Sequence, residues 1–177
     1  MMNTFQPSRS SVERVFEILD TPPTIADRPG AEPVRDFHDR LVLERVSFRY
    51  PEAEEDALGD VSLTVRKGEM VAFVGMSGAG KTTLMDLVPR FHDVQAGRIV
   101  IDGCDIREVS VASLRALMGI VTQETFLFAD TIGYNIGYGR PGATQADIEH
   151  AARMAQAHDF VASTLRQQVR RPWPPAP

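Results

Sequence analysis

The string GMSGAGKTT, from Gly75 to Thr83, constrains the fold of this 177-residue chain more than any other feature. It follows a continuous apolar run, Met70 to Val74, which is typical of a strand buried on both faces of a sheet. Its glycines allow a tight backbone turn, and the residues from about Gly80 onward read as a helix. A buried strand, a glycine loop and a helix in this order predict an α/β fold with a P-loop.

The same string matches the pattern G-x-x-x-x-G-K-[ST], whose residue types suit the phosphates of a nucleoside triphosphate. Its glycines let successive backbone N–H groups approach phosphate oxygens without a Cβ in the way. The Lys81 ammonium would reach the β and γ phosphates, and the Thr82 hydroxyl would be a ligand of magnesium. A glycine turn without a ligand is the alternative, but the flanking strand and helix favour a phosphate site. The predicted nucleotide-binding residues are Gly75, Met76, Ser77, Gly78, Ala79, Gly80, Lys81, Thr82 and Thr83.

Two strands in an antiparallel arrangement are predicted before this loop, so that the folded part begins near Leu41. The apolar face of the first strand would comprise Val42, Val46, Phe48 and Tyr50. The second strand would alternate apolar and polar residues through Val61, Leu63 and Val65.

Further strands and helices are predicted after the loop. They are a strand over Arg98–Ile101 with an Asp102-Gly103 turn, a short helix over Ser113–Leu117 and a strand over Gly119–Thr122. Thr144 and Asp147 then form a capping-box pattern that begins a helix through about Ala157, and a further helical stretch continues to about Gln168. The alternation of strands and helices again predicts an α/β core.

The two ends of the chain differ in composition from the middle. Ser11 to Leu19 has helical spacing behind a capping serine, and Thr21 to Asp39 contains four prolines and no periodicity, which is typical of a linker. The chain ends in a proline-rich run that cannot form regular structure.

Composition excludes several classes of protein. The net charge of -5 offers no clustered basic surface, so nucleic acid is not an expected partner. A single cysteine, Cys104, excludes an internal disulfide and fits a reducing compartment. No apolar run approaches the roughly 18 to 20 residues that a membrane-spanning helix needs.

Residues on both sides of the loop indicate which P-loop family this is. VSFRYP places Tyr50 at a strand end about 25 residues before Gly75, and VTQETFLF places Gln123 about 40 residues after Lys81. With AGRIVIDGCDIREVS and DTIGYNIGYG, the region from about residue 8 to 160 closely resembles the nucleotide-binding domain of ATP-binding cassette (ABC) exporters, of the type fused to its own transmembrane domain.

This resemblance implies that the ligand is ATP with magnesium, that Tyr50 stacks on the adenine, and that Gln123 offers its carbonyl to magnesium or the attacking water. On the residues alone, Tyr50 could be an ordinary strand-end aromatic and Gln123 a surface amide, and stacking would tolerate either purine. Phe126, Leu127 and Phe128 could be core residues or the surface that in this family receives the membrane domain.

The resemblance also implies partners and a location: a transmembrane domain and a second nucleotide-binding domain, at the cytoplasmic face of the plasma membrane. It divides the chain into residues 1–39, a helix and linker resembling the exit from the last membrane helix, residues 40–163, part of a nucleotide-binding domain, and residues 164–177, a tail unlike the family. Such exporters couple ATP hydrolysis to export, and the membrane domain selects the substrate.

Three parts that the family needs for hydrolysis do not occur in the 177 residues: an LSGGQ signature, an apolar strand ending in Asp-Glu (Walker B) and a switch histidine. The run Ile99 to Asp102 resembles a Walker B strand, but Gly103 follows it where the motif has a glutamate. His150 and His158 lie too early in the domain to be the switch histidine. We therefore expect a partial domain, incomplete at its C-terminus by a frameshift, that binds ATP without hydrolysing it. The alternatives are a non-catalytic fragment that docks on a transporter and a small P-loop kinase.

Overall fold

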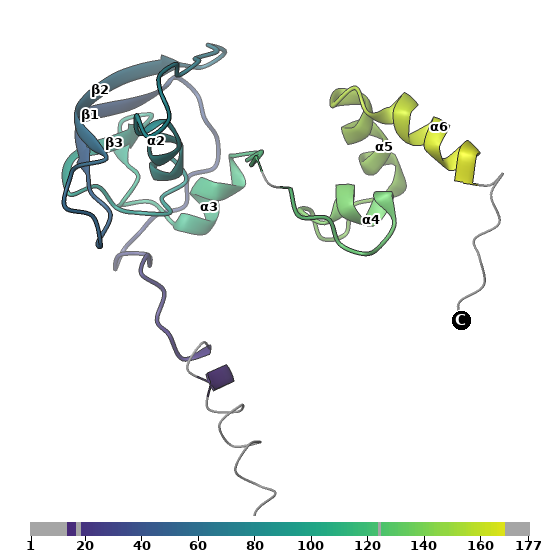
Figure 1. The fold of residues 1–177 in the computed structure, drawn as a ribbon, viewed down its shortest axis with the longest axis horizontal. Coiled ribbons are helices and arrows are strands. Elements are labelled where there is room, and N and C mark those ends of the chain that lie inside the picture. Colours follow the sequence, from purple (N-terminus) through teal and green to yellow (C-terminus); the bar gives the residue numbers. More distant parts are fainter. Residues whose placement is uncertain (1–13, 17–18, 124, 169–177) are drawn as a thin grey trace, which may run out of the picture. The chain divides into compact units, whose positions relative to one another are not determined.

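The computed structural model describes residues 14–16, 19–123 and 125–168, and it divides into two units, residues 1–120 and 121–177 (Figure 1). The first unit contains a four-stranded antiparallel sheet with the order β2-β1-β3-β4. Its strands are β1 (Arg40–Phe48), β2 (Leu58–Arg66), β3 (Ala96–Ile101) and β4 (Cys104–Asp105). The antiparallel β part predicted before the glycine loop is therefore confirmed, and β3 is a third long strand of the same sheet.

A two-residue turn joins β3 to β4, as the Asp102-Gly103 pair predicts. Asp102 has φ 48° and Gly103 has φ 90°, and Ile101 pairs with Cys104 across the turn. Positive φ at both central residues is the geometry of a type I′ hairpin turn, whose twist matches that of the flanking strands.

A bulge in β1 changes which of its residues face the core. The pairing of β1 with β2 shifts between Leu43 and Val46, and Arg45 at the shift has φ 46°. The extra residue reverses the alternation, so Leu43 joins Val46 and Phe48 in the core, while Val42 is only half-buried. The prediction that Val42 shares the buried face of Val46 and Phe48 is therefore wrong.

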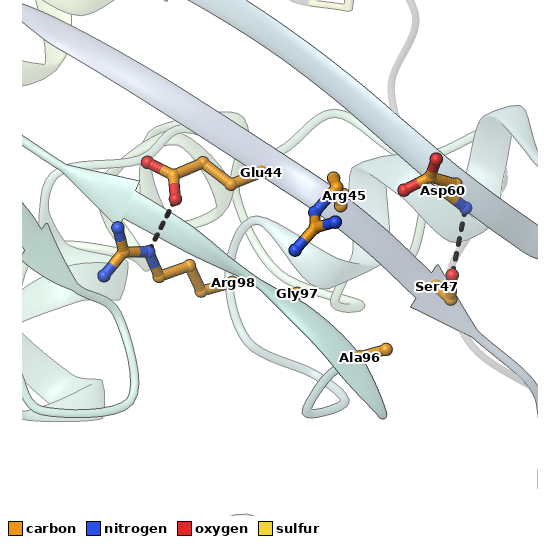
Figure 2. Close-up of a pocket in the computed structure, with 7 residues that line it drawn as sticks. All are labelled: Glu44, Arg45, Ser47, Asp60, Ala96, Gly97 and Arg98. Atoms are coloured by element: carbon orange, nitrogen blue, oxygen red, sulfur yellow. Dashed lines mark hydrogen bonds and ion pairs between the residues drawn. The ribbon is translucent and has the colours of Figure 1, made fainter.

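Gly97 of β3 lies opposite this bulge (Figure 2). It has φ 75°, and a Cβ at this position would overlap the carbonyl oxygens of Glu44 and Arg45. The two backbones can approach so closely only because residue 97 has no side chain. The surrounding hollow, of about 570 Å³, is lined by Glu44, Arg45, Ser47, Asp60, Ala96, Gly97 and Arg98, and an ion pair between Glu44 and Arg98 borders it.

The helices α2 (Lys81–Leu87) and α3 (Val111–Ala116) pack on the core of the first unit. Leu84 and Leu87 of α2 and Leu114 of α3 are buried in the same apolar cluster as the strands. The other buried members of this core are Leu43, Val46, Phe48, Leu58, Ile99, Ile101, Ile106 and Val109. The helix directly after the glycine loop is thus anchored by its apolar face on the core.

The strands predicted over Met70–Val74 and Gly119–Thr122 do not form. Both segments lack regular structure, and the exposed fractions are 98% for Met70, 95% for Val74 and 95% for Val121. A strand of this apolar type is stable only when neighbouring strands pair with it and cover its faces. Among the described residues no strand pairs with either segment, which is why local sequence preference alone does not organise them.

The predicted linker, Thr21–Asp39, contains no helix or long strand but is attached to the first unit. Glu32 forms a parallel bridge with Val109, and the Val34 N–H donates to Ser113 Oγ at 3.0 Å. Of the predicted helix Ser11–Leu19, residues 14–16 and 19 are helical and the rest lie outside the described residues. The predicted linker is therefore part of the first unit, where it packs against the segment from Val109 to Ser113.

The second unit is helical: α4 (Ile132–Gly137), α5 (Gln145–Met154) and α6 (His158–Gln168). The capping box at the start of α5 is confirmed, because the Asp147 N–H donates to Thr144 Oγ1 and the Thr144 N–H donates to the Asp147 carboxylate. The proline-rich run from Arg170 lies outside the described residues.

Asp102 fastens the end of the linker to the β3–β4 turn. Its carboxylate accepts the backbone N–H groups of His38, Asp39 and Arg40 at 2.6, 2.9 and 2.9 Å. Partial burial acts to raise the pKa of Asp102, but these three N–H groups outweigh it and hold the pKa below its ordinary value of 3.8.

We therefore expect Asp102→Asn to destabilise the first unit by about 1–2 kcal/mol at neutral pH, since charge-assisted hydrogen bonds are lost at a partly exposed site. A carboxylate whose pKa is lowered by folding stabilises above its unfolded-state pKa and loses this contribution as the pH falls through the folded-state value. The difference between wild type and variant should therefore shrink as the pH falls below 3.8. Urea unfolding at several pH values measures this, with Asp60→Asn as the control, because Asp60 also has positive φ (51°). If Asp102→Asn and Asp60→Asn lower the free energy of unfolding equally, the hydrogen bonds of the Asp102 carboxylate are not the cause.

Candidate nucleotide-binding site

The glycine loop, residues 75–80, leads directly into α2, which begins at Lys81. Gly78 and Gly80 have φ 81° and 79°, in the left-handed region that favours glycine. A Cβ on Gly80 would come within 2.5 Å of the Ala57 carbonyl oxygen and 2.8 Å of Leu58 Cδ2. Gly80 therefore permits both the turn into the helix and its close approach to the start of β2.

Lys81 crosses back over the loop that precedes it. Its ammonium donates to the carbonyl oxygens of Gly75 at 2.9 Å and Met76 at 2.6 Å. The cation is thus held beside the loop backbone, and the first turn of α2 contains no acidic residue that would offset it. The ammonium and the partial positive charge of the helix N-terminus both favour an anion at this loop.

The two threonines after Lys81 have different environments. Thr82 is exposed, so its hydroxyl is open to a ligand, whereas Thr83 is 7% exposed and faces the core. Among the described residues no three His, Cys, Asp or Glu side chains lie close enough together to hold a metal ion. A magnesium ion at this loop would therefore depend on the Thr82 hydroxyl together with phosphate and water oxygens.

Tyr50 is brought to the same helix. Its hydroxyl donates to Thr83 Oγ1 at 3.3 Å, and its half-buried ring packs against the core. The rings of Phe48 and His92 lie 4.9 and 5.4 Å from it, both at an interplanar angle of 85°. The first unit thus brings the predicted base-stacking residue and the predicted phosphate loop together, although 25 residues separate them in the sequence.

Gln123 is exposed and belongs to the second unit, so its predicted role as a ligand of magnesium or water stays a prediction. Nearby, Phe126 and Leu127 are exposed, by 78% and 71%, while Phe128 packs on Tyr138 with ring centroids 4.2 Å apart. Phe126 also meets Phe128 edge to face, with ring centroids 5.0 Å apart, so both phenylalanines belong to an aromatic cluster of the second unit although Phe126 is largely exposed.

Asp102, at the end of the imitation Walker B run, is used structurally. Its carboxylate accepts the three backbone N–H groups of residues 38–40. The interpretation that the run Ile99–Asp102 is not a catalytic strand stays a prediction.

His92 is a residue of this site that sequence reasoning missed. It follows α2 by five residues and contacts Tyr50 from the opposite end of that helix to Lys81. No local pattern indicates this contact, because it joins positions 42 residues apart.

With this geometry in view, comparison with known proteins identifies the family. The family model described as "ABC transporter" matches residues 58–171, which is more than half of the chain. The chain belongs to the ABC transporter family. The matched region of this ABC domain extends past residue 163, where the family-like part was predicted to end, and that boundary stays a prediction.

The ABC domain is similar to parts of a flippase and of an exporter. The ATP-dependent lipid A-core flippase of Syntrophus aciditrophicus (strain SB) is 50% identical over 159 residues, which are 90% of this chain and 26% of the flippase. The structure of a bacterial Atm1-family ABC exporter with ATP bound matches with a TM-score of 0.78 at 42% identity, over 90% of this chain and 28% of that one. The predicted resemblance to ABC exporters and the predicted fold class are both confirmed.

The ABC domain spans about a quarter of the length of these relatives. Within the part of the chain that the structure describes, no helix is long and apolar enough to cross a membrane.

Proposed function

We propose that this ABC domain binds Mg-ATP through the loop Gly75–Thr83 and stacks the base on Tyr50. The observation that carries the proposal is the position of Tyr50, whose hydroxyl donates to Thr83 at the end of the phosphate-binding string. One helix, α2, thereby carries Lys81, the predicted triphosphate-binding residue, and contacts Tyr50, the predicted base-stacking residue. A loop that merely turned the chain would not require an aromatic side chain at this place.

We further propose that the 177 residues bind ATP without turning it over. The sequence contains no apolar strand ending in Asp-Glu, and Asp102, its nearest imitation, is occupied by three backbone N–H groups. Without a carboxylate to orient the attacking water, positioning of the triphosphate alone accelerates hydrolysis little.

Calorimetric titration of the full chain with Mg-ATP tests both proposals, with phosphate release assayed on the same samples. We expect saturable binding, an affinity at least several-fold lower in Tyr50→Ala, and no release above that of free ATP. The Tyr50→Phe variant is the matched control, because it keeps the stacking ring and removes only the hydroxyl. Turnover by the wild type would overturn the second proposal, and absence of any binding would overturn the first.

In the full-length context we propose that the ABC domain acts at the cytoplasmic face of a membrane, with a transmembrane domain and a second nucleotide-binding domain as partners. Its 50% identity to a flippase and its similarity to an ATP-bound exporter support this. The exposed Phe126 and Leu127 form an apolar surface in the second unit that fits a protein partner. Co-purification of the chain with a separately expressed exporter membrane domain tests it, and failure to associate would count against a docking role.

A further inference from the structure

The loop from Arg90 to Gln95 follows the nucleotide-proximal helix and is held by contacts at both of its ends. At its start, Arg90 has φ 55°, and its backbone N–H donates to the Leu87 carbonyl. The Phe91 N–H donates to the backbone carbonyl of Asp86. Two such bonds after a left-handed residue end a helix in a defined direction.

The Arg90 side chain holds this loop closed. It is 1% exposed, and its guanidinium donates to both oxygens of the Asp93 carboxylate at 2.7 and 3.2 Å. A doubly bonded ion pair between a buried guanidinium and a partly exposed carboxylate restricts the backbone between its partners. His92 lies between Arg90 and Asp93 and is therefore presented in a defined position.

From this position the loop contacts Tyr50 through His92 and the preceding residue, Arg49, through Gln95. The His92 ring lies 5.4 Å from the Tyr50 ring and 5.3 Å from the Phe48 ring, so the three rings form a closed cluster. The Gln95 amide binds the backbone of Arg49, the residue before Tyr50, with bonds of 2.8 Å from the Arg49 N–H and 2.6 Å to its carbonyl. One contact restrains the Tyr50 ring and the other restrains the chain that bears it.

Both rings beside Tyr50 meet it at 85°, so neither uses the parallel arrangement by which an aromatic side chain stacks on a base. The Tyr50 hydroxyl is in turn fixed at Thr83. The Tyr50 side chain is thus restrained by two ring contacts and at its hydroxyl, and neither ring contact is of the parallel type.

We propose that His92, with Gln95, is a positioning residue for nucleotide binding: it orients Tyr50 for stacking on the base, and so contributes to affinity for nucleotide without contacting it. The inference rests on the proposed ATP binding. It identifies residues that make the affinity for nucleotide depend on the base. A ring held in place before binding loses less freedom when the base arrives, which raises affinity.

The test compares ATP with inorganic triphosphate, which has the phosphates but no base, by calorimetric titration of the full chain. We expect His92→Ala to lower the affinity for Mg-ATP by roughly three- to tenfold, the range of one lost aromatic pair. Its affinity for triphosphate should be unchanged, which also shows that the loop is folded in the variant. The His92→Phe variant should restore ATP affinity to within about twofold, since a ring of similar shape still packs on Phe48 and Tyr50.

A double-mutant cycle makes the mechanism specific. If His92 acts through Tyr50, the change His92→Ala should have no further effect on ATP affinity in a Tyr50→Ala background. Gln95→Ala should show the same selective loss for ATP over triphosphate.

Each other outcome overturns the inference in a recognisable way. An equal loss for ATP and triphosphate would mean that His92 supports the fold of the whole site and has no positioning role. Unchanged ATP affinity in His92→Ala would overturn the positioning role alone and leave ATP binding intact. If the wild-type chain binds Mg-ATP no more tightly than triphosphate, Tyr50 does not stack on the base. If the wild-type chain binds neither ligand, the proposed function itself is overturned.

Discussion

Replacing Gly97 by alanine is expected to destabilise the first unit by about 2–4 kcal/mol. Gly97 has φ 75°, and a non-glycine residue in this region costs about 1–2 kcal/mol. The added Cβ would also overlap the carbonyl oxygens of Glu44 and Arg45. These are backbone atoms of the central strand β1, which is bonded on both sides and cannot move away without breaking ladder hydrogen bonds.

Gly68→Ala is the matched control for this variant. Gly68 has φ 85°, but a Cβ there would meet nothing within 4 Å. It should therefore show the cost of positive φ alone, about 1–2 kcal/mol. Urea unfolding, with hydrogen exchange of the β1 and β3 amides to localise the effect, measures both variants. If Gly97→Ala and Gly68→Ala lower the free energy of unfolding equally, the close approach of β3 to the β1 bulge is not the cause of the loss.

Lys81→Ala is expected to weaken binding of Mg-ATP by at least tenfold, because charge-assisted hydrogen bonds to phosphate are each worth about 1.5–3 kcal/mol. The structure adds a second cause. The ammonium also donates to the carbonyl oxygens of Gly75 and Met76, so its loss removes the bonds that hold the loop around the cation. The exposed loop, in which Met76 is 84% exposed, should then exchange its amide hydrogens faster even without ligand.

The control for Lys81 is the only other lysine of the sequence, Lys67, which is exposed in the turn after β2. Lys67→Ala removes the same charge from the same chain at a position outside the site. It should leave ATP affinity unchanged at moderate salt, because exposed charges a Debye length away are screened. Similar losses in both variants would indicate a general charge effect, and unchanged affinity in Lys81→Ala would remove the loop from the binding site. Isothermal titration calorimetry of both variants with Mg-ATP measures these affinities.

Much of the first unit could be predicted because the signals are local. The Asp102-Gly103 turn, the alternation of β2 and the start of α2 after Gly80 each depend on residues within one turn or strand. The capping box of α5 is likewise a four-residue signal and appears as predicted. The nucleotide-binding string is recognisable for the same reason, since its glycines and lysine act through one short loop.

The errors concern features that depend on distant parts of the chain. The bulge at Arg45, which moves Leu43 into the core in place of Val42, is a property of strand pairing and leaves no mark in the alternation of β1. The run Met70–Val74 has the composition of a buried strand but is exposed, because its composition cannot supply the neighbouring strands that would pair with it.

The sequence by itself therefore determined the family, and it predicts the phosphate-binding loop and the residue types that would hold a triphosphate, because these are encoded within a few consecutive positions. Only the tertiary structure decided what holds Tyr50 and the residue before it: the hydroxyl of Thr83 and the ring of His92 contact Tyr50, and the amide of Gln95 binds the backbone of Arg49. These contacts join residues 33 to 46 positions apart. Their physical origin is the packing of the residues that follow β1 against α2 and the loop after it, which no local pattern expresses.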